Sequence, residues 1–429
     1  MPAMNIVLVA GITVLAYALI SVFSNKKAWI SRGAAALLII IGAAPFVEAL
    51  RDYINWNVLA IYVGSLILAE LFIYSRVPAV IAEWIANKSP SAAIAIALIA
   101  LFAGLVSAFV ENVATVLVVA PIAIEISRKV KVPLGPVMVL LAVNANLQGT
   151  ATLVGDPPSM LFAGAAGFSF NDFFFYNGKP SIFFFVEFGA IIGAAYSFFV
   201  LRKHTHKEPV PRDSRVISWV PLLLLTAMVA GLAVNSIYET GVGARAGMIC
   251  LLAALLGQVW FVLFRKEKLS EAMRIMRQLD WETLFFLVGI FIMLGALNRS
   301  GAIGVLANGM QSAFGSNVLA IYVFLVVVSV LVSGFVDNVP YIALMLPLIA
   351  DVSSRLGVEP TVLYFGLLIG ACLGGNVTPF GASANIVAMG LAKKNGDNMD
   401  FSGFVRIGAP FTFVTTALTA TAVWLVWGT

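Results

Sequence analysis

Two short strings place a carboxylate next to an asparagine in the middle of apolar sequence. They are Glu111-Asn112-Val113 and Asp337-Asn338-Val339, and each follows Phe-Val, with no basic residue close by in the sequence. Ionisable groups at that depth in apolar segments are rare and usually functional. An unpaired carboxylate there would hold a proton, which suits proton coupling. With backbone carbonyls it could instead hold Na⁺.

The two asparagines leave two interpretations open. Backbone that unwinds inside hydrocarbon must find hydrogen-bond partners, and an asparagine side chain can supply them. The same side chain can coordinate a cation or bind a hydroxylated solute. We therefore expect Asn112 and Asn338 either to hold the backbone or to bind Na⁺ transiently, with no tightly bound metal and no cofactor.

Two further strings, NANLQGTATLVGDPP at 144–158 and CLGGNVTPFGASANIV at 372–387, interrupt apolar helices with polar residues and glycine. Glycine permits open backbone, and proline is favoured at the start of a helix. Half-helices beginning at Pro157 and near Ala382 would direct positive partial charge at a site. The expected site residues in these strings are Asn144, Asn146, Thr150, Thr152, Gly155, Asp156, Asn376, Thr378, Gly381, Ser383 and Asn385.

Five carboxylates are candidates for proton coupling. Glu111, Asp156 and Asp337 belong to the interrupted strings, while Glu70 and Glu187 lie in other apolar runs. For the last two, a structural hydrogen bond is as good an interpretation as a proton relay. The coupling ion predicted from these groups is H⁺ or Na⁺.

Composition assigns the chain to the membrane. Of 429 residues, 61% are hydrophobic and 11% are charged, and the mean hydropathy is +0.99. A soluble domain would be about half apolar and about a quarter charged. The net charge of +5 does not indicate a nucleic-acid partner, because the basic residues lie in short loops between apolar runs. We expect the lipid bilayer as partner.

The apolar runs predict an all-α polytopic protein of ten spans plus two re-entrant helical hairpins. Continuous runs occur at about 4–24, 33–50, 54–74, 180–201, 217–237, 244–264, 281–298 and 408–428. Each interrupted region divides into a hairpin (92–128 and 317–353) and a broken helix (134–167 and 361–393). Segment 267–280 is expected to be an interfacial helix.

The basic residues test this layout. Alternating the loops between two sides leaves only Arg51, Lys179, Arg245, Arg299 and Arg355 on one side, and the other 21 of the 26 Lys and Arg residues on the opposite side. The positive-inside rule then places both termini outside and the 202–216 loop in the cytoplasm. We expect a multi-pass protein of the cell (inner) membrane.

The interrupted regions match one another at an offset of 226 residues. Glu111 and Asn112 correspond to Asp337 and Asn338, Pro121 to Pro347, and Gly149, Thr152 and Gly155 to Gly375, Thr378 and Gly381. Shared polar residues, prolines and glycines at a fixed offset indicate duplication. The predicted units are 1–201 and 217–429, joined by the linker 202–216. Because each unit has an odd number of spans, the second is inverted, and interrupted helices in inverted units are typical of a substrate site near the midplane.

The strings FVENV, FVDNVPYIALMLPLI, NLQGTATLVGDPPSM and GACLGGNVTPFGASANIV resemble the ArsB, NhaD and P-protein branch of the ion transporter superfamily, over about residues 50–429. The wider superfamily includes citrate transporters and dicarboxylate/sodium symporters. The resemblance implies two inverted five-helix repeats, elevator-type movement and a homodimer. In the dicarboxylate symporters the hairpin tips carry Ser-Asn-Thr, whereas here carboxylate and valine flank the asparagine. Unless they are protonated, two acids beside the site repel an anionic substrate.

These observations predict a secondary transporter rather than an enzyme. The leading hypothesis is proton-coupled efflux of a small inorganic species of the arsenite and antimonite type. The alternatives are a Na⁺/H⁺ antiporter of the NhaD kind and an anion or di/tricarboxylate permease. No nucleotide-binding loop appears, so direct use of ATP is not indicated, and an associated ATPase subunit has no support in the sequence.

Overall fold

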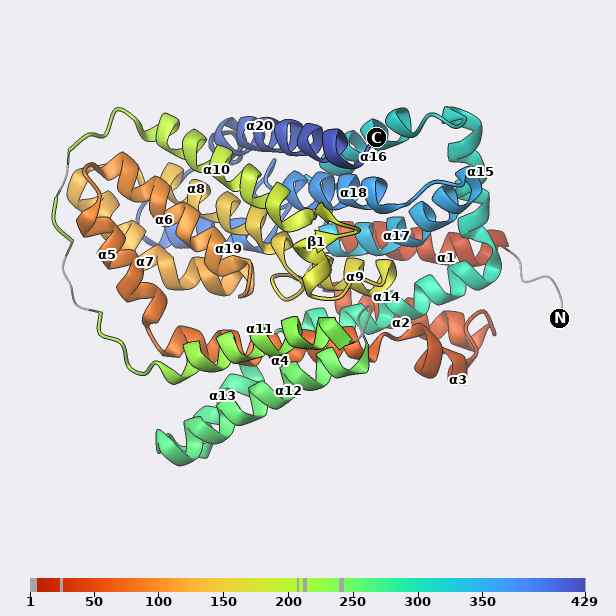
Figure 1. Ribbon diagram of the computed structural model, residues 1–429, viewed down its shortest axis with the longest axis horizontal. Coiled ribbons are helices and arrows are strands. Elements are labelled where there is room, and N and C mark those ends of the chain that lie inside the picture. Colours follow the sequence, from red (N-terminus) through yellow and green to blue (C-terminus); the bar gives the residue numbers. More distant parts are fainter. Residues whose placement is uncertain (1–5, 24–25, 207, 211–213, 239–242, 429) are drawn as a thin grey trace.

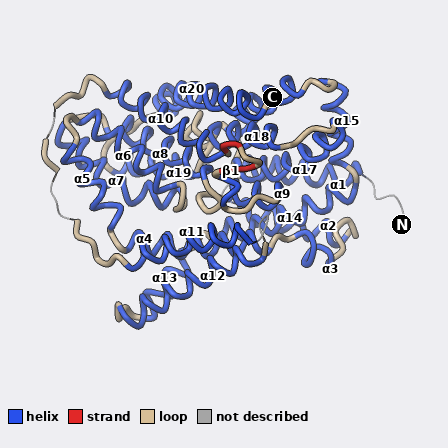
Figure 2. The backbone as a smooth tube through the Cα atoms, in the orientation of Figure 1, coloured by secondary structure: helices blue, strands red, loops and turns tan. Residues whose placement is uncertain are grey.

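The computed structural model describes residues 6–23, 26–206, 208–210, 214–238 and 243–428. These residues are almost entirely helical, with one short β-hairpin (Figures 1 and 2). Seven of the described helices are long and apolar enough to cross a membrane, or eight if one bent pair counts as a span. The prediction of an all-α, multi-pass membrane protein is confirmed.

The elements follow in chain order. The first part contains α1 (Ile6–Val22), α2 (Lys27–Ile40), α3 (Phe46–Glu48), α4 (Trp56–Tyr74), α5 (Val77–Lys88), α6 (Ala92–Ser107), α7 (Asn112–Val130), α8 (Leu134–Gln148), α9 (Pro157–Ala166), β1 (Phe175–Tyr176), β2 (Lys179–Pro180) and α10 (Ile182–Leu201). The second part contains α11 (Val220–Tyr238), α12 (Ala244–Val259), α13 (Leu269–Gln278), α14 (Trp281–Ser300), α15 (Ala302–Phe314), α16 (Val318–Ser333), α17 (Asn338–Leu356), α18 (Thr361–Gly374), α19 (Ser383–Lys394) and α20 (Phe401–Trp427).

Helices α8 and α18 form the centre of the molecule, because every residue of α18 and every residue of α8 except Pro136 is buried. A helix that is apolar on all sides has no face for water and packs in the interior. Helix α8 contacts α6, α7, α10, α19 and α20, while α18 contacts α16, α17, α20 and α9. Large apolar side chains on α1, α11 and α12 are exposed instead, as expected for surfaces that face lipid.

The short half-helices pack across the chain. Helix α9 contacts α17, which lies far along the sequence, and α19 contacts α7 and α8. Figure 1 shows the yellow α9 beside the blue α17, and the blue α19 among the orange helices α7 and α8. The half-helix that follows each break therefore packs against one or more helices from the other part of the chain.

The two helix breaks use equivalent bonds. The hydroxyl of Thr152 donates to the carbonyl of Ala108, and the hydroxyl of Thr378 donates to the carbonyl of Gly334 at 2.5 Å. Both acceptors are carbonyls at the end of the first helix of a hairpin, where no intrahelical partner remains. The threonines thus fasten each broken segment to a hairpin.

Two glycines permit this close crossing. A Cβ on Gly155 would lie 2.2 Å from the carbonyl oxygen of Gly149 and 2.9 Å from that of Ala108. A Cβ on Gly381 would lie 2.5 Å from the carbonyl oxygen of Gly375 and 2.8 Å from that of Ser333. Because the obstructing atoms are backbone, no rotamer change can relieve the clash.

The predicted span 33–50 is wrong. Helix α2 begins earlier, at Lys27, and ends at Ile40. The chain then turns at Gly42, whose φ of +77° favours glycine, and continues into the separate helix α3. Lys27 and Arg32 are consequently helical residues rather than parts of a loop. The helices α1, α2 and α3 gather at one end of the molecule, and the described parts of 202–216 curve round the other (Figure 1).

We expect Gly381→Ala to destabilise the protein, since overpacking costs roughly 1–3 kcal/mol and the backbone here cannot retreat. The measurement is the thermal unfolding midpoint of the detergent-solubilised protein. Gly390→Ala is the matched control, because its Cβ would meet nothing within 4 Å on α19. Equal midpoints for the two variants would contradict the crossing geometry.

Candidate functional site

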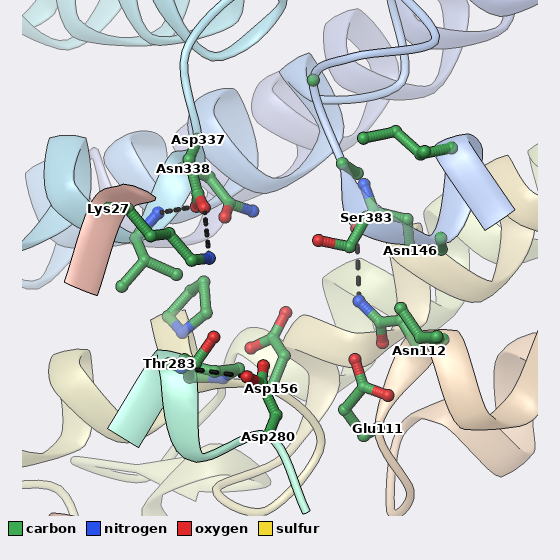
Figure 3. Close-up of a pocket in the computed structure, with 18 of the residues that line it drawn as sticks. Lys27, Glu111, Asn112, Asn146, Asp156, Asp280, Thr283, Asp337, Asn338 and Ser383 are labelled. Atoms are coloured by element: carbon green, nitrogen blue, oxygen red, sulfur yellow. Dashed lines mark hydrogen bonds and ion pairs between the residues drawn. The ribbon is translucent and has the colours of Figure 1, made fainter. Parts of the chain in front are cut away.

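A cavity of about 410 Å³ lies where the hairpin tips and helix breaks converge. It is bounded by the tips before α7 and α17, by the N-terminal ends of α9, α14 and α19, and by the first residue of α2. Figure 3 shows its polar side chains directed into one shared space. The polar residues that line it are Ser21, Lys27, Tyr62, Glu111, Asn112, Asn146, Asp156, Asp280, Glu282, Thr283, Asp337, Asn338 and Ser383.

Eight of the residues expected from the sequence line this cavity. They are Glu111, Asn112, Asn146, Asp156, Asp337, Asn338, Gly381 and Ser383. The other seven lie behind its wall: Asn144, Thr150, Thr152, Gly155, Asn376, Thr378 and Asn385. Six of these seven residues have a buried polar side chain, and Gly155 is the exception. The expected set therefore divides into residues that face the cavity and residues that support it.

The carboxylates at the hairpin tips cap the helices that follow. Glu111 accepts a bond from the backbone amide of Ala114 at 3.0 Å, and Asp337 accepts one from Val339 at 3.0 Å. Such caps satisfy amides that have no partner in the first helical turn. The geometry fixes one oxygen of each carboxylate while both residues still line the cavity.

Three asparagines form a chain of bonds through the centre. The Asn112 amide donates to Asn146 Oδ1 at 3.2 Å, and Asn146 Nδ2 donates to Asn376 Oδ1 at 3.0 Å. Asn376 in turn donates to the carbonyl of Val143 at 3.0 Å. This chain connects the first hairpin tip with both broken segments. A buried polar network whose members are paired keeps one arrangement of its elements.

The remaining supporting residues bond to the backbone or to each other. Asn385 donates to the carbonyls of Gly375 and Thr378, and Asn144 donates to the carbonyl of Leu140 and to Ser197. These bonds favour the structural interpretation for both residues, since neither faces the cavity.

Asp156 both caps a helix and lines the cavity. It caps α9 by accepting from the amide and the hydroxyl of Ser159, at 3.0 and 2.7 Å, and it accepts from Thr150 at 3.4 Å. It also lines the cavity. The corresponding cap of α19 is Ala382, which has no side-chain bond. The two breaks thus differ by one carboxylate.

Glu70 and Glu187 lie elsewhere. Both are partly buried in α4 and α10, and neither lines the cavity. The structure places neither of them in the cavity, although Glu70 lies close enough to Glu111 to repel its charge.

Six charged or hydroxyl residues of the cavity were not expected from the sequence: Ser21, Lys27, Tyr62, Asp280, Glu282 and Thr283. Asp280 caps α14 through Thr283 and accepts a bond from Tyr62 at 3.4 Å. A signal for it existed, because Trp281 aligns with Trp56 and the residue before Trp56 is Asn55, which caps α4. No comparable signal pointed to Lys27, because the prediction placed this residue in a loop.

Lys27 corrects the expectation for Asp337. The sequence places no basic residue near that carboxylate, yet the structure puts Lys27 Nζ 2.9 Å from Asp337 Oδ2. The cause is the fold, which brings α2 to the second hairpin tip from 310 residues away. Asp337 is therefore paired, whereas none of the salt bridges among the described residues includes Glu111, although Lys27 lines the same cavity.

The cavity is strongly acidic. Its lining contains the carboxylates of Glu111, Asp156, Asp280, Glu282 and Asp337, and Lys27 is the one basic residue in the described lining. At 4 Å and an effective dielectric of about 20, each unneutralised carboxylate repels an anion by about 4 kcal/mol. This arrangement can bind protons, a cation or an uncharged hydroxylated solute, and it opposes a multiply charged anion. Among the described residues, no group of three or more His, Cys, Asp or Glu could hold a metal ion.

Comparison with known proteins gives consistent results. A family profile described as citrate transporter matches residues 17–370 and, in a second overlapping stretch, 312–428. An uncharacterized transporter of Mycobacterium tuberculosis is 30% identical over 427 residues, covering 98% of each chain. The human P protein is 25% identical, over 90% of this chain and 55% of its own.

Solved structures share the fold. The Alcanivorax borkumensis YdaH transporter superposes with a TM-score of 0.62 at 12% identity, over 91% of this chain and 88% of that one. Neisseria gonorrhoeae MtrF is described within a class of antimetabolite efflux pumps. It superposes with a TM-score of 0.56 at 16% identity, over 91% of this chain and 84% of that one.

Substitutions at Asp156 separate its two functions. We expect Asp156→Ala to lower the stability by about 1 kcal/mol, because the cap of α9 is lost. Asp156→Asn keeps an oxygen that accepts from Ser159, so its thermal midpoint should stay close to that of the unchanged protein. The check is thermal unfolding of both variants in detergent, and a loss of stability in the asparagine variant as large as in the alanine variant would refute the capping assignment.

Proposed function

Because the chain belongs to the citrate transporter family of membrane transporters, we propose that it is a proton-coupled secondary transporter. Its proposed cargo is a small uncharged, hydroxyl-bearing inorganic acid of the arsenite and antimonite type, which it exports. The observation that carries this proposal is the acidic cavity between two hairpin tips and two helix breaks.

The charge of the cavity supports an uncharged cargo. Five carboxylates and one ammonium surround the space, and their net field repels citrate or a dicarboxylate. A neutral hydroxylated molecule meets no such repulsion. Asn112, Asn338 and Ser383 line the space and offer it donors and acceptors.

Two carboxylates that have no basic partner are candidate carriers of the proton. Glu111 and Asp156 face the cavity and come from different elements, the first hairpin tip and the first helix break. Intramembrane carboxylates without a basic partner are typical of proton relays. Each accepts a backbone amide bond through one oxygen, and the second oxygen of Asp156 also accepts from the hydroxyl of Thr150.

Alternating access would use the matched segments. The equivalent bonds of Thr152 and Thr378 and the equivalent crossings at Gly155 and Gly381 support an inverted repeat of residues 1–201 and 217–429. In such repeats the site stays near the midplane while one body moves against the other. The orientation that follows from the basic residues has both termini outside and 202–216 in the cytoplasm.

A second candidate is Na⁺/H⁺ exchange. One observation favours it: both carboxylate–asparagine pairs line the same cavity, and carboxylate and amide oxygens are ligands that hard cations accept. In this case the cavity would bind Na⁺ and protons in turn.

The deciding experiment is transport by the purified full-length protein in sealed vesicles that contain a pH indicator. An imposed pH gradient is followed after adding arsenite, antimonite, Na⁺ or citrate. We expect proton movement that depends on arsenite or antimonite. Proton movement with Na⁺ alone would replace the proposal with the second candidate, and movement with citrate alone would overturn both.

Glu111→Gln tests the carrier assignment. Glutamine can still accept the Ala114 amide bond but cannot exchange a proton, so we expect cargo-dependent proton flux to fall by roughly tenfold or more. Glu125→Gln is the matched control on the same helix, since Glu125 pairs with Lys129 near the surface. Unchanged flux in the Glu111 variant would exclude Glu111 as the carrier.

A further inference from the structure

The ammonium of Lys27 lies beside Asp337 in the acidic cavity. A mobile cation would be expected at this position, next to a carboxylate. Lys27 Nζ lies 2.9 Å from Asp337 Oδ2, and the two side chains are 15% and 25% exposed. Lys27 is the first residue of α2 and follows Ser21 and Ile20, which line the same cavity from the end of α1. Figure 3 shows Lys27 directed at Asp337, with both residues at the same side of this space.

Other groups face the same ammonium. From α14, Asp280 and Glu282 attract it electrostatically, and the ring of Phe286 lies 5.3 Å from Nζ. From α17, Asp337 bonds to it directly, while α1 contributes Ile20 and Ser21 to the same cavity. When Lys27 leaves Asp337, the two acids of α14 are thus available to receive it.

The ion pair joins two helices that both pack against α14. Helix α2 packs mainly against α14 and α1, whereas Asp337 caps α17, which packs against α9, α15 and α18 as well as α14. Breaking the pair therefore removes the salt bridge between α2 and the second hairpin tip. A long flexible lysine side chain can make such an exchange without movement of the backbone.

We propose that Lys27 is a coupling residue: a tethered cation that holds Asp337 while no coupling ion is bound there, and that is displaced when a proton or Na⁺ binds. The inference rests on the proposed function, which supplies the coupling ion. In the protonated form one O–H bond forms on Asp337, the ammonium–carboxylate pair breaks, and Lys27 remains charged beside Asp280 and Glu282. The cavity gains one positive charge, which is the charge of the bound proton.

The test measures protonation and requires no transport. Infrared difference spectra of the purified full-length protein, recorded during a pH titration, report the carbonyl band of protonated carboxyl groups. The band of Asp337 is the one that disappears in Asp337→Asn. In Lys27→Met its midpoint should move to higher pH by about one unit or more, because an ammonium at hydrogen-bonding distance opposes protonation by that much.

Two controls isolate the charge of Lys27. Lys27→Arg keeps the cation and should keep the midpoint near that of the unchanged protein. Lys26→Met removes the neighbouring lysine, which is exposed and does not line the cavity, and should also have no effect. An Asp337 midpoint that is the same in Lys27→Met and in the unchanged protein would overturn the inference.

Transport supplies the second measurement. In vesicles, Lys27→Met should move the pH of half-maximal proton flux in the same direction as the infrared midpoint, and Lys27→Arg should not. An infrared shift with no change in the flux profile would also overturn the inference, because Lys27 would then be only a structural partner. If the unchanged protein carries no proton flux with any solute, the proposed function fails, while the infrared titration still decides whether Lys27 competes for Asp337.

Discussion

The structure depends on how it satisfies backbone that is not helical inside a membrane. Each unsatisfied amide or carbonyl in hydrocarbon costs several kcal/mol, and this chain unwinds at two hairpin tips and two helix breaks. Threonine hydroxyls close the breaks onto the hairpins, while Glu111, Asp156 and Asp337 cap the helices that begin there. The groups that complete the backbone are thereby placed around one cavity.

This arrangement explains why structural and chemical roles coincide in the same side chains. Each of these carboxylates caps a helix through one oxygen and also lines the cavity. The second oxygen of Asp337 pairs with Lys27, and that of Asp156 accepts from Thr150. The asparagine chain from Asn112 to Asn376 then connects the first tip to both breaks. A change of charge at Glu111 therefore occurs next to the bonded chain that joins the first tip to both breaks.

The sequence predicted local features better than distant ones. Gly155, Thr152 and their counterparts Gly381 and Thr378 were visible because the short polar strings interrupt apolar runs, and the helices begin and end within a few residues of the expected breaks. Lys27 and the pairing of Asp337 could not be found this way, because 310 residues separate the partners and only the packing of α2 on α14 brings them together. The end of α2 at Ile40 was missed since the apolar run continues beyond it.

The packing of the half-helices also has a consequence for biogenesis. Helix α9 rests on α17, and α19 rests on α7 and α8, and the cavity lining contains residues from both parts of the chain. Contacts so distant in sequence form slowly and only after the later helices have been synthesised. A nascent chain that ends before α17 lacks Asn338, Ser383 and the other later residues of the lining. The cavity is therefore complete only after the last helices have docked.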